Sequence, residues 1–336
     1  MKKIIPVILA VINIFVLVFV PVHAIIENKN VTADTGQKNY NTILTLWQID
    51  TFEGGINSRQ DFLMRAALLF EKTHKGALVS VVNHTEQSAE ESLGKGIIPD
   101  MLSYGTGVDF AAGYCKELKG VLKFAGGEYG GKYYAVPWCR GGYYLISKNI
   151  LTDSPIEKLI ISKGGYNNPY TSLALGNIKA AEYEVKEPLA AYTAFLSGMN
   201  KGEVLLGTQR DIFRLNRRGI ETVSAPLSEF SDIYQYVSVF SSDAKRYSLC
   251  SDFIDCLLSD GAQEKLNSIG MCSVTISGLY GDYPAVAAFE SKSISYTLSA
   301  FSTKSANAEI ENKSKLYITE ENIDLNEIKL ELKQLK

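Results

Sequence analysis

The chain has 336 residues, of which 21% are charged and 46% hydrophobic, as in an ordinary globular protein. Its formal net charge is −3, and its Lys and Arg residues are scattered. No basic face is therefore available to neutralise phosphates, and we do not expect nucleic acid as a partner. Tyrosine is frequent, with 19 Tyr against 14 Phe and 2 Trp. This favours a protein that presents amphipathic rings to a ligand or a partner.

The N-terminus has the pattern of an export signal. Lys2-Lys3 precedes an apolar stretch from Ile4 to Val20, and Val22-His23-Ala24 offers a signal-peptidase site. We therefore expect a signal peptide over residues 1–24, a polar tether over 25–41, and an extracellular or cell-surface location. An uncleaved anchor is the alternative, because about 17 apolar residues nearly span a bilayer. Removing 24 of the 336 residues leaves 312, enough for two lobes, and the loss of two lysines takes the net charge from −3 to −5.

The cysteine and histidine content argues against a metal site. Five cysteines follow the predicted cut, at Cys115, Cys139, Cys250, Cys256 and Cys272. An odd number leaves at least one thiol free unless it pairs between chains. Cys250 and Cys256 share a predicted helix, where six residues separate their Cα atoms by about 9 Å, too far for a disulfide. With no CxxC pattern and only His74 and His84 remaining after the cut, we expect neither a zinc site nor a cofactor.

The first third of the sequence alternates strands with helices. We predict three strands and two intervening helices, at 43–49, 58–75, 78–82, 85–93 and 99–104. This order gives right-handed parallel βαβ units and an α/β sheet. Ligands bind beyond the carboxyl ends of the strands in such sheets. Those ends lie at 47–55, 83–85 and 104–109, and they form a candidate half-site.

The middle of the sequence changes character. Residues 126–144 are rich in Gly and Tyr, and we predict strands at 133–136 and 142–146 that cross between lobes, with a bend at Pro137-Trp138. Residues 148–190 show little periodicity, and we interpret them as irregular. Further on we predict helices at 191–196, 212–217, 249–266 and 323–335 and strands at 204–207 and 237–240, the last returning the chain to the first lobe.

Three segments carry a resemblance. The first joins Leu44-Thr45-Leu46-Trp47 and Phe52-Glu53-Gly54-Gly55 to Pro99-Asp100-Met101-Leu102-Ser103. The second is Gly131-Lys132-Tyr133-Tyr134-Ala135-Val136-Pro137-Trp138, and the third runs from Phe253-Ile254 through Leu257-Leu258-Ser259-Asp260 and Ala262-Gln263 to Gly270. Together, over roughly residues 43–275, they resemble the bacterial extracellular solute-binding proteins of the family that includes maltose-binding protein. Two departures are a second lobe that looks short and the absence of a lipobox Cys.

The resemblance implies a two-lobed, periplasmic-binding-protein-like α/β fold with crossing strands at a hinge. We expect lobe 1 at 42–138 and 238–272, lobe 2 at 139–237 and 273–310, and a C-terminal helix or tail at 311–336. It also implies a monomeric receptor that captures a small solute, a sugar or an oligosaccharide, for the permease subunits of an ABC importer. The lobes would close on the solute through strands near 136–146 and 236–242.

Aromatic side chains near the predicted crossing are candidates for stacking on a sugar ring. Trp138 follows Pro137 and precedes Gly141-Gly142, which leave space beside the indole. A core position at the lobe junction is the alternative for Trp138. Trp47 ends a strand but lies in an apolar run, so both interpretations stay open for it. Tyr104 and Tyr170 are weaker aromatic candidates.

Polar candidates come from turns after strands. Glu53 can accept hydrogen bonds from neighbouring hydroxyls, or it is a solvated turn residue. Gln209 and Arg210 bring amide and guanidinium donors from the second lobe, although Arg210 can instead pair with Asp211, which can itself cap the next helix. The complete set of predicted ligand-binding residues is Trp47, Glu53, Tyr104, Asp109, Trp138, Arg140, Tyr170, Gln209 and Arg210.

Two other classes of function remain open. An enzyme would need paired carboxylates for glycoside hydrolysis, and Glu53 with Asp109 is the pair to nominate. The sequence has no Gly-x-Ser-x-Gly, Walker or metal motif. We therefore do not expect an enzyme. A surface scaffold of the same fold without ligand binding is the third class, suggested by the short second lobe.

Overall fold

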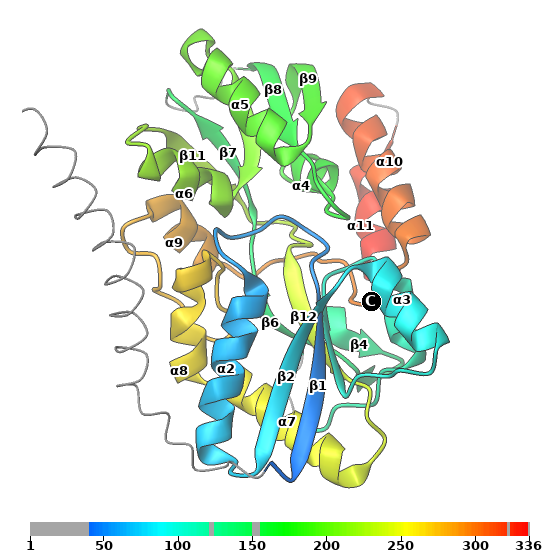
Figure 1. The fold of residues 1–336 in the computed structure, drawn as a ribbon. Coiled ribbons are helices and arrows are strands. Elements are labelled where there is room, and N and C mark those ends of the chain that lie inside the picture. The colour runs from blue at the N-terminus through cyan, green and yellow to red at the C-terminus, as the bar shows by residue number, and fades with distance from the viewer. Residues whose placement is uncertain (1–39, 121–123, 150–154, 321–322, 335–336) are drawn as a thin grey trace, which may run out of the picture. The chain divides into compact units, whose positions relative to one another are not determined.

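The computed structural model describes residues 40–120, 124–149, 155–320 and 323–334 (Figure 1). The predicted signal peptide at 1–24 and the tether up to residue 39 lie outside these ranges. Met1–Asn41 and Thr42–Lys336 are separate units, and the second contains the sheets of both lobes. Among the helices in the described ranges, none combines the length and the apolarity that a membrane crossing requires.

Lobe 1 is built on a five-stranded sheet, visible in the lower half of Figure 1. The strand order is β2 (Ala77–His84), β1 (Thr42–Ile49), β3 (Met101–Tyr104), β12 (Tyr234–Val239) and β6 (Val136–Arg140). β1 pairs in parallel with β2 and β3, which confirms the predicted βαβ units, and β12 returns antiparallel between β3 and β6.

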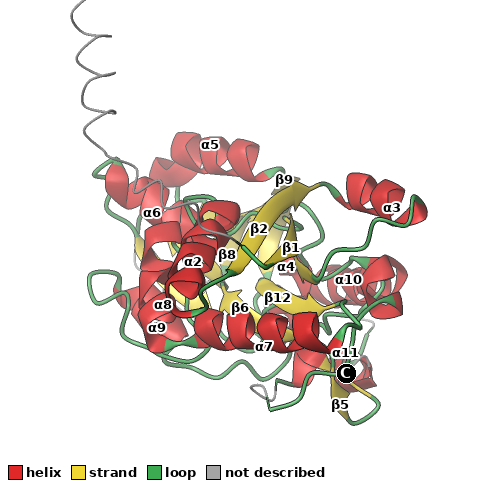
Figure 2. Cartoon of the chain, turned by 60° about the horizontal axis from the view of Figure 1, so that its bottom comes forward, coloured by secondary structure: helices red, strands yellow, loops and turns green. Residues whose placement is uncertain are grey.

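Three helices enclose the sheet of lobe 1. α2 (Arg59–Thr73) and α7 (Ala244–Leu258) bury apolar side chains in the core on one face, where they lie side by side (Figure 2). α3 (Glu86–Gly94) packs against the other face. The predicted start of α2 is confirmed, because Ser58 accepts a hydrogen bond from the Asp61 N–H at 3.1 Å.

Lobe 2 is built on a second five-stranded sheet. Its order is β11 (Val223–Leu227), β7 (Tyr143–Ser147), β10 (Val204–Thr208), β8 (Ile156–Ser162) and β9 (Ala180–Lys186). The helices of lobe 2 are α4 (Pro169–Leu175), α5 (Pro188–Gly198), α6 (Gln209–Arg217) and α9 (Pro284–Glu290). The prediction of an irregular region at 148–190 was wrong, since β8, α4 and β9 lie within it. The edge strand β9 is only partly buried along its length, so its sequence carries little apolar signal.

The C-terminal part continues with α8 (Asp260–Gln263), α10 (Lys304–Glu320) and α11 (Leu325–Gln334). α11 confirms the helix predicted at 323–335, while α10 was not predicted. α10 packs against α4 of lobe 2 and against α11 (Figure 1). Lys163 forms an ion pair with Glu311 of α10, and the Thr171 and Ser314 hydroxyls are hydrogen-bonded at 2.8 Å. All five cysteines lie in the described ranges, and none of them forms a disulfide there.

The predicted bend at Pro137-Trp138 was wrong. A short hairpin of β4 (Glu128–Tyr129) and β5 (Lys132–Tyr133) comes first, and β6 then runs straight through Pro137. β6 tolerates a proline because it is an edge strand and its pairing with β12 shifts register between Gln235 and Tyr236. The chain passes from β6 to β7 through Gly141–Gly142, where a Cβ on Gly141 would stand 2.5 Å from the Gln209 amide nitrogen.

Three of the segments that cross between the lobes lie together, close to Gly141, Ile233 and Cys272. Gly141 donates a backbone hydrogen bond to Ile233 O at 2.7 Å. Arg140 and Cys272 exchange two more, at 2.9 and 2.8 Å. These bonds tie the three crossings into one unit, which we call the triple crossing.

Candidate functional site

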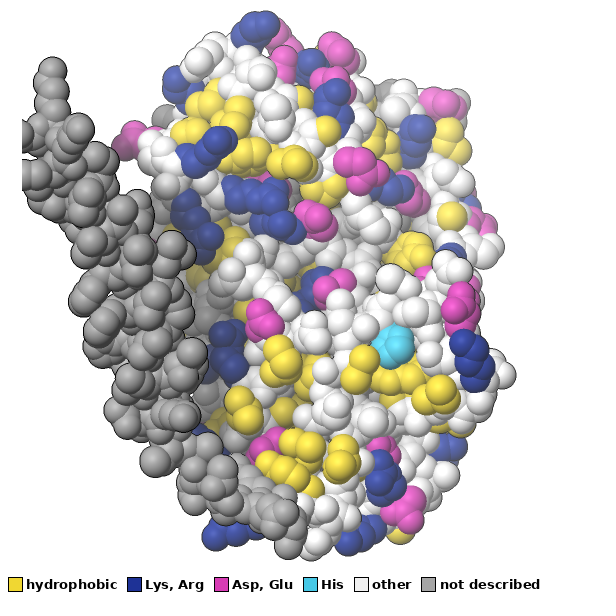
Figure 3. All heavy atoms as spheres, viewed as in Figure 1, with side chains coloured by type: hydrophobic (Ala, Val, Ile, Leu, Met, Phe, Trp, Pro, Cys, Tyr) yellow, Lys and Arg dark blue, Asp and Glu magenta, His cyan; other side chains and the backbone are white. Residues whose placement is uncertain are grey.

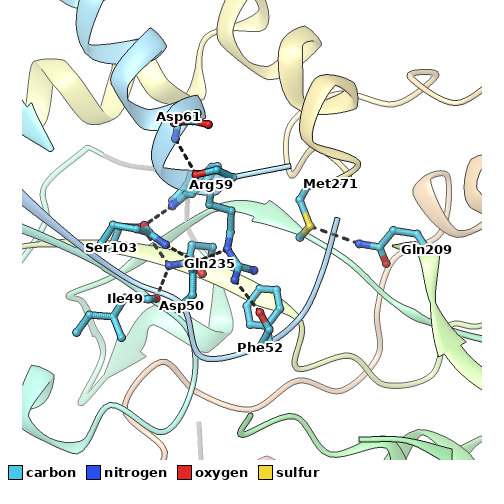
Figure 4. A network of polar contacts seen from close by, with 12 residues as sticks. Ile49, Asp50, Phe52, Arg59, Asp61, Ser103, Gln209, Gln235 and Met271 are labelled. Carbon is cyan, nitrogen blue, oxygen red and sulfur yellow. Dashed lines mark hydrogen bonds and ion pairs between the residues drawn. The ribbon is translucent and has the colours of Figure 1, made fainter. Parts of the chain in front are cut away.

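The loop after β1, residues 50–55, is held in place by the first residue of α2. Arg59 is buried; it donates from Nε to Asp50 Oδ1 at 2.6 Å and from Nη2 to Phe52 O at 2.7 Å (Figure 4). Its guanidinium also lies over the Phe52 ring, 4.1 Å from the centroid. The loop is thus fixed before any ligand arrives, which lowers the entropic cost of binding there.

Asp50 presents a carboxylate at the carboxyl end of β1. Gln48 donates from Nε2 to the same oxygen that Arg59 uses, at 2.8 Å. Within the described ranges both hydrogen bonds go to Oδ1, and the side chain is 46% exposed. Asp50 Oδ2 is therefore an oriented acceptor at the place where α/β sheets bind ligands.

Glu53 and Arg210, both predicted from the sequence, meet across the two lobes. Arg210 Nη1 lies 2.7 Å from Glu53 Oε2, and the two side chains are 26% and 49% exposed. Burial lowers the pKa of Arg210, and the charge of Glu53 acts in the opposite direction. Arg210 therefore pairs with Glu53 rather than with Asp211, which forms a capping box with Thr208 at the start of α6.

Tyr166, in the loop between β8 and α4, touches lobe 1 at three places. Its backbone N–H donates to Thr51 O at 2.9 Å, and its hydroxyl donates to Glu86 Oε2 at 2.6 Å. Its ring lies against Gly107, where a Cβ would be only 3.0 Å from it. The neighbouring Gly165 has φ +65°, and a Cβ there would overlap Thr51 O. We call this line of contacts, with the Glu53–Arg210 pair, the interlobe seam.

Gln209 is fully buried beside the triple crossing. Its Oε1 accepts from the Gly142 N–H at 3.1 Å, and its Nε2 lies 3.4 Å from the Met271 sulfur (Figure 4). Asp232 is buried nearby and accepts hydrogen bonds from the Tyr143 hydroxyl and the Asn168 N–H, at 2.7 and 2.6 Å. Burial raises the pKa of Asp232 to about 6.

The structure places the aromatic candidates of lobe 1 in its core. Trp138 is 0% exposed, its indole stacks on Phe62 at 5.2 Å between centroids, and its N–H donates to Ser103 Oγ at 3.0 Å. The sequence left the core position open for Trp138, and the structure favours it. Tyr104 is also fully buried, with its hydroxyl 3.0 Å from that of Ser238. Trp47 is buried as well.

The other predicted residues lie apart from the seam or are used elsewhere. Arg140 donates to three backbone carbonyls, of Ser273, Lys292 and Glu290, at 3.1, 3.1 and 2.6 Å. These bonds fix the lobe 2 segments next to the triple crossing. Tyr170 is buried on α4, and Asp109 accepts a hydrogen bond from the Lys304 N–H at 3.1 Å.

Sequence reasoning missed Asp50, Thr51, Arg59 and Tyr166. A signal existed for Asp50 and Thr51, because both lie in the range 47–55 that the sequence marked as a strand end. Thr51 takes part through its carbonyl, which no side-chain pattern reports. Tyr166 lies in the region interpreted as irregular, so its place at the end of β8 could not be recognised.

A cavity of about 360 Å³ opens between the lobes beside the seam. Ile56, Asn267 and Ser268 line it from lobe 1, and Phe213, Arg217 and Tyr280 line it from lobe 2. Lys and Arg side chains gather over α6 next to it (Figure 3). Within the described ranges, no group of His, Cys, Asp and Glu side chains is placed to hold a metal ion.

The fold is similar to that of solved two-lobed substrate-binding proteins. The GacH receptor of Streptomyces glaucescens, solved without ligand and with acarbose, is similar at 15% identity and a TM-score of 0.54. The match covers 87% of this chain and 97% of the GacH chain. The maltose/maltodextrin-binding domain MalE of Bdellovibrio bacteriovorus, bound to maltotriose, matches at 12% identity and a TM-score of 0.52, over 87% and 99% of the two chains.

A third structure of this class is the ABC substrate-binding protein Lmo0181 of Listeria monocytogenes in complex with cycloalternan. It has 12% identity and a TM-score of 0.54, over 88% of this chain and 98% of its own. These likenesses show the fold. Their nearly complete coverage gives no support to the short second lobe expected from the sequence. No protein-family model matches the sequence, and no curated protein matches it.

Proposed function

We propose that this chain is an extracellular receptor of an ABC importer that captures a carbohydrate between its lobes by hinge closure. The observation that carries the proposal is the interlobe seam. It brings strand-end loops of both lobes together in a fold whose solved examples hold acarbose, maltotriose and cycloalternan. The predicted lobe limits and the permease subunits as partners belong to this proposal, as do the monomeric state and the absence of catalysis.

A neutral sugar suits the seam better than an acidic one. Arg210 already has a carboxylate partner in Glu53 at 2.7 Å, so its charge is compensated within the protein. Asp50 adds an oriented acceptor for hydroxyl donors. An acidic ligand would have to displace Glu53 from Arg210 and would be repelled by both carboxylates.

A thermal-shift screen of the purified chain against a carbohydrate library tests the proposal. The library should include acarbose, maltotriose and cycloalternan, with release of reducing ends followed in parallel. A ligand at about 100 times its Kd stabilises the folded state by about 2.7 kcal/mol. A raised unfolding temperature without cleavage is the expected result, and cleavage would identify an enzyme instead.

A scaffold without ligand binding is the second candidate. The specific observation that favours it is the direct contact of the lobes at Thr51 and Tyr166, which occupies part of the space a ligand would use. If no carbohydrate raises the unfolding temperature, the scaffold replaces the receptor.

A further inference from the structure

Tyr166 bridges the lobes through two hydrogen bonds and a ring contact. Its N–H and hydroxyl donate to two acceptors on lobe 1, Thr51 O and Glu86 Oε2, at 2.9 and 2.6 Å. Its ring covers the backbone of Gly107. A hydroxylated solute that bound to lobe 1 at this place would have to donate to the same two oxygens.

Glu86 is held ready for this contact by a third element. Lys304, the first residue of α10, places its Nζ 2.7 Å from Glu86 Oε1 and 5.1 Å from the centroid of the Tyr166 ring. The Glu86 side chain is 13% exposed. The pair of Glu86 with Lys304 leaves Oε2 to accept the Tyr166 hydroxyl. Charge-assisted hydrogen bonds of this kind are stronger than neutral ones.

We propose that Tyr166 is a latch that holds the lobes together in the unliganded protein, and that a solute must displace it to reach lobe 1. Tyr166 therefore lowers the affinity for any solute that competes for this position. The latch comprises the contacts of Tyr166 with Thr51, Glu86 and Gly107. The inference concerns the regulation of the proposed site, and only its consequence for solute affinity rests on the proposed function.

Amide hydrogen exchange of the unliganded full-length chain tests the latch. The Tyr166 N–H is the reporter, because its partner is on the other lobe and it exchanges only when the lobes part. Tyr166→Phe keeps the ring and the N–H and removes only the bond to Glu86. We expect at least about tenfold faster exchange at residue 166, the lower end of the ratio that corresponds to one charge-assisted hydrogen bond.

Two controls make the result specific. Tyr129→Phe removes a phenol hydroxyl from an exposed hairpin residue and should leave exchange at residue 166 unchanged. Peptides from β12 should exchange equally in all variants, which shows that the fold is intact. Glu86→Leu removes the acceptor and should also speed exchange, and combining it with Tyr166→Phe should add little, because both remove the same bond.

Unchanged exchange at residue 166 in Tyr166→Phe would overturn the latch, as would full additivity in the double variant. No ligand enters this experiment, so its failure is separate from a failure of the carbohydrate screen. If both hold, the carbohydrate found in the screen should bind Tyr166→Phe more tightly than wild type.

Discussion

Replacing Trp138 by alanine distinguishes a core residue from a ligand contact. The indole is 0% exposed and stacks on Phe62. Its loss removes a large apolar surface and leaves a cavity, which costs about 3–5 kcal/mol in buried aromatic positions. It also removes the N–H donor to Ser103 Oγ, which the Gln235 amide still reaches at 3.2 Å. We therefore expect Trp138→Ala to lower the free energy of unfolding by about 4 kcal/mol.

Urea unfolding followed by circular dichroism measures this loss, with Trp138→Phe and Tyr129→Ala as controls. Trp138→Phe keeps a ring over Phe62 and loses the N–H donor, so about 1–2 kcal/mol is expected. Tyr129 is 70% exposed, and its replacement should change stability by no more than about 0.5 kcal/mol. A Trp138→Ala protein of unchanged stability that binds its carbohydrate tenfold more weakly would refute the reasoning and place the indole at the ligand.

Three further predictions concern charged groups. Because burial raises the pKa of Asp232 to about 6, its favourable contribution is complete below about pH 4 and is lost as pH rises through 6. Between pH 4 and 7, this group should lower the free energy of unfolding of the wild type by up to about 3 kcal/mol. Urea unfolding of Asp232→Asn should not show this decrease. Burial acts to raise the pKa of Asp100, but hydrogen bonds led by Arg246 outweigh it and lower the pKa. Arg246→Met should cost about 2–3 kcal/mol at pH 7 and less as pH falls below about 4. Glu53→Gln should change the free energy of unfolding by less than about 1 kcal/mol, because the side chain is half exposed. The difference should shrink in high salt. A larger loss that does not depend on salt would contradict this.

Local signals explain what the sequence could predict of the fold. The cap at Ser58 and the apolar spacing of α2 involve residues within a few turns of one another, so the pattern contains them. The parallel pairing of β1 with β2 and β3 follows from the strand–helix alternation. The sequence did not predict β8 and β9 because three of the seven residues of β8 and all seven of β9 are partly or fully exposed, and hydrophobic periodicity reports burial.

The prediction for Trp138 depended on whether β6 continues through Pro137. Side chains alternate between the two faces of a strand, so a residue inside β6 has a fixed face while a residue at a bend has none. The sequence placed a bend at Pro137-Trp138, and the structure places both residues inside β6. With β6 continuous to Arg140, Trp138 points to the face covered by α2 and Phe62.

The site was predicted in part, because charge pairs carry a side-chain signal and backbone contacts do not. Glu53 and Arg210 were both recognised as candidates, although only the structure shows that they pair. The bond from Tyr166 to Thr51 joins two backbone groups 115 positions apart. Any sequence with the same backbone would permit it, apart from the requirement for glycine at Gly165.

The triple crossing determines how the lobes can move relative to each other. A single connecting peptide would allow them to twist and slide as well as bend. Twisting would stretch the bonds from Gly141 to Ile233 and between Arg140 and Cys272, so bending is the form that the proposed hinge motion should take. If the lobes open by that proposed motion, the contact of Tyr166 with Thr51 and the pair of Glu53 with Arg210 must break as well. Weakening either contact should therefore make opening easier.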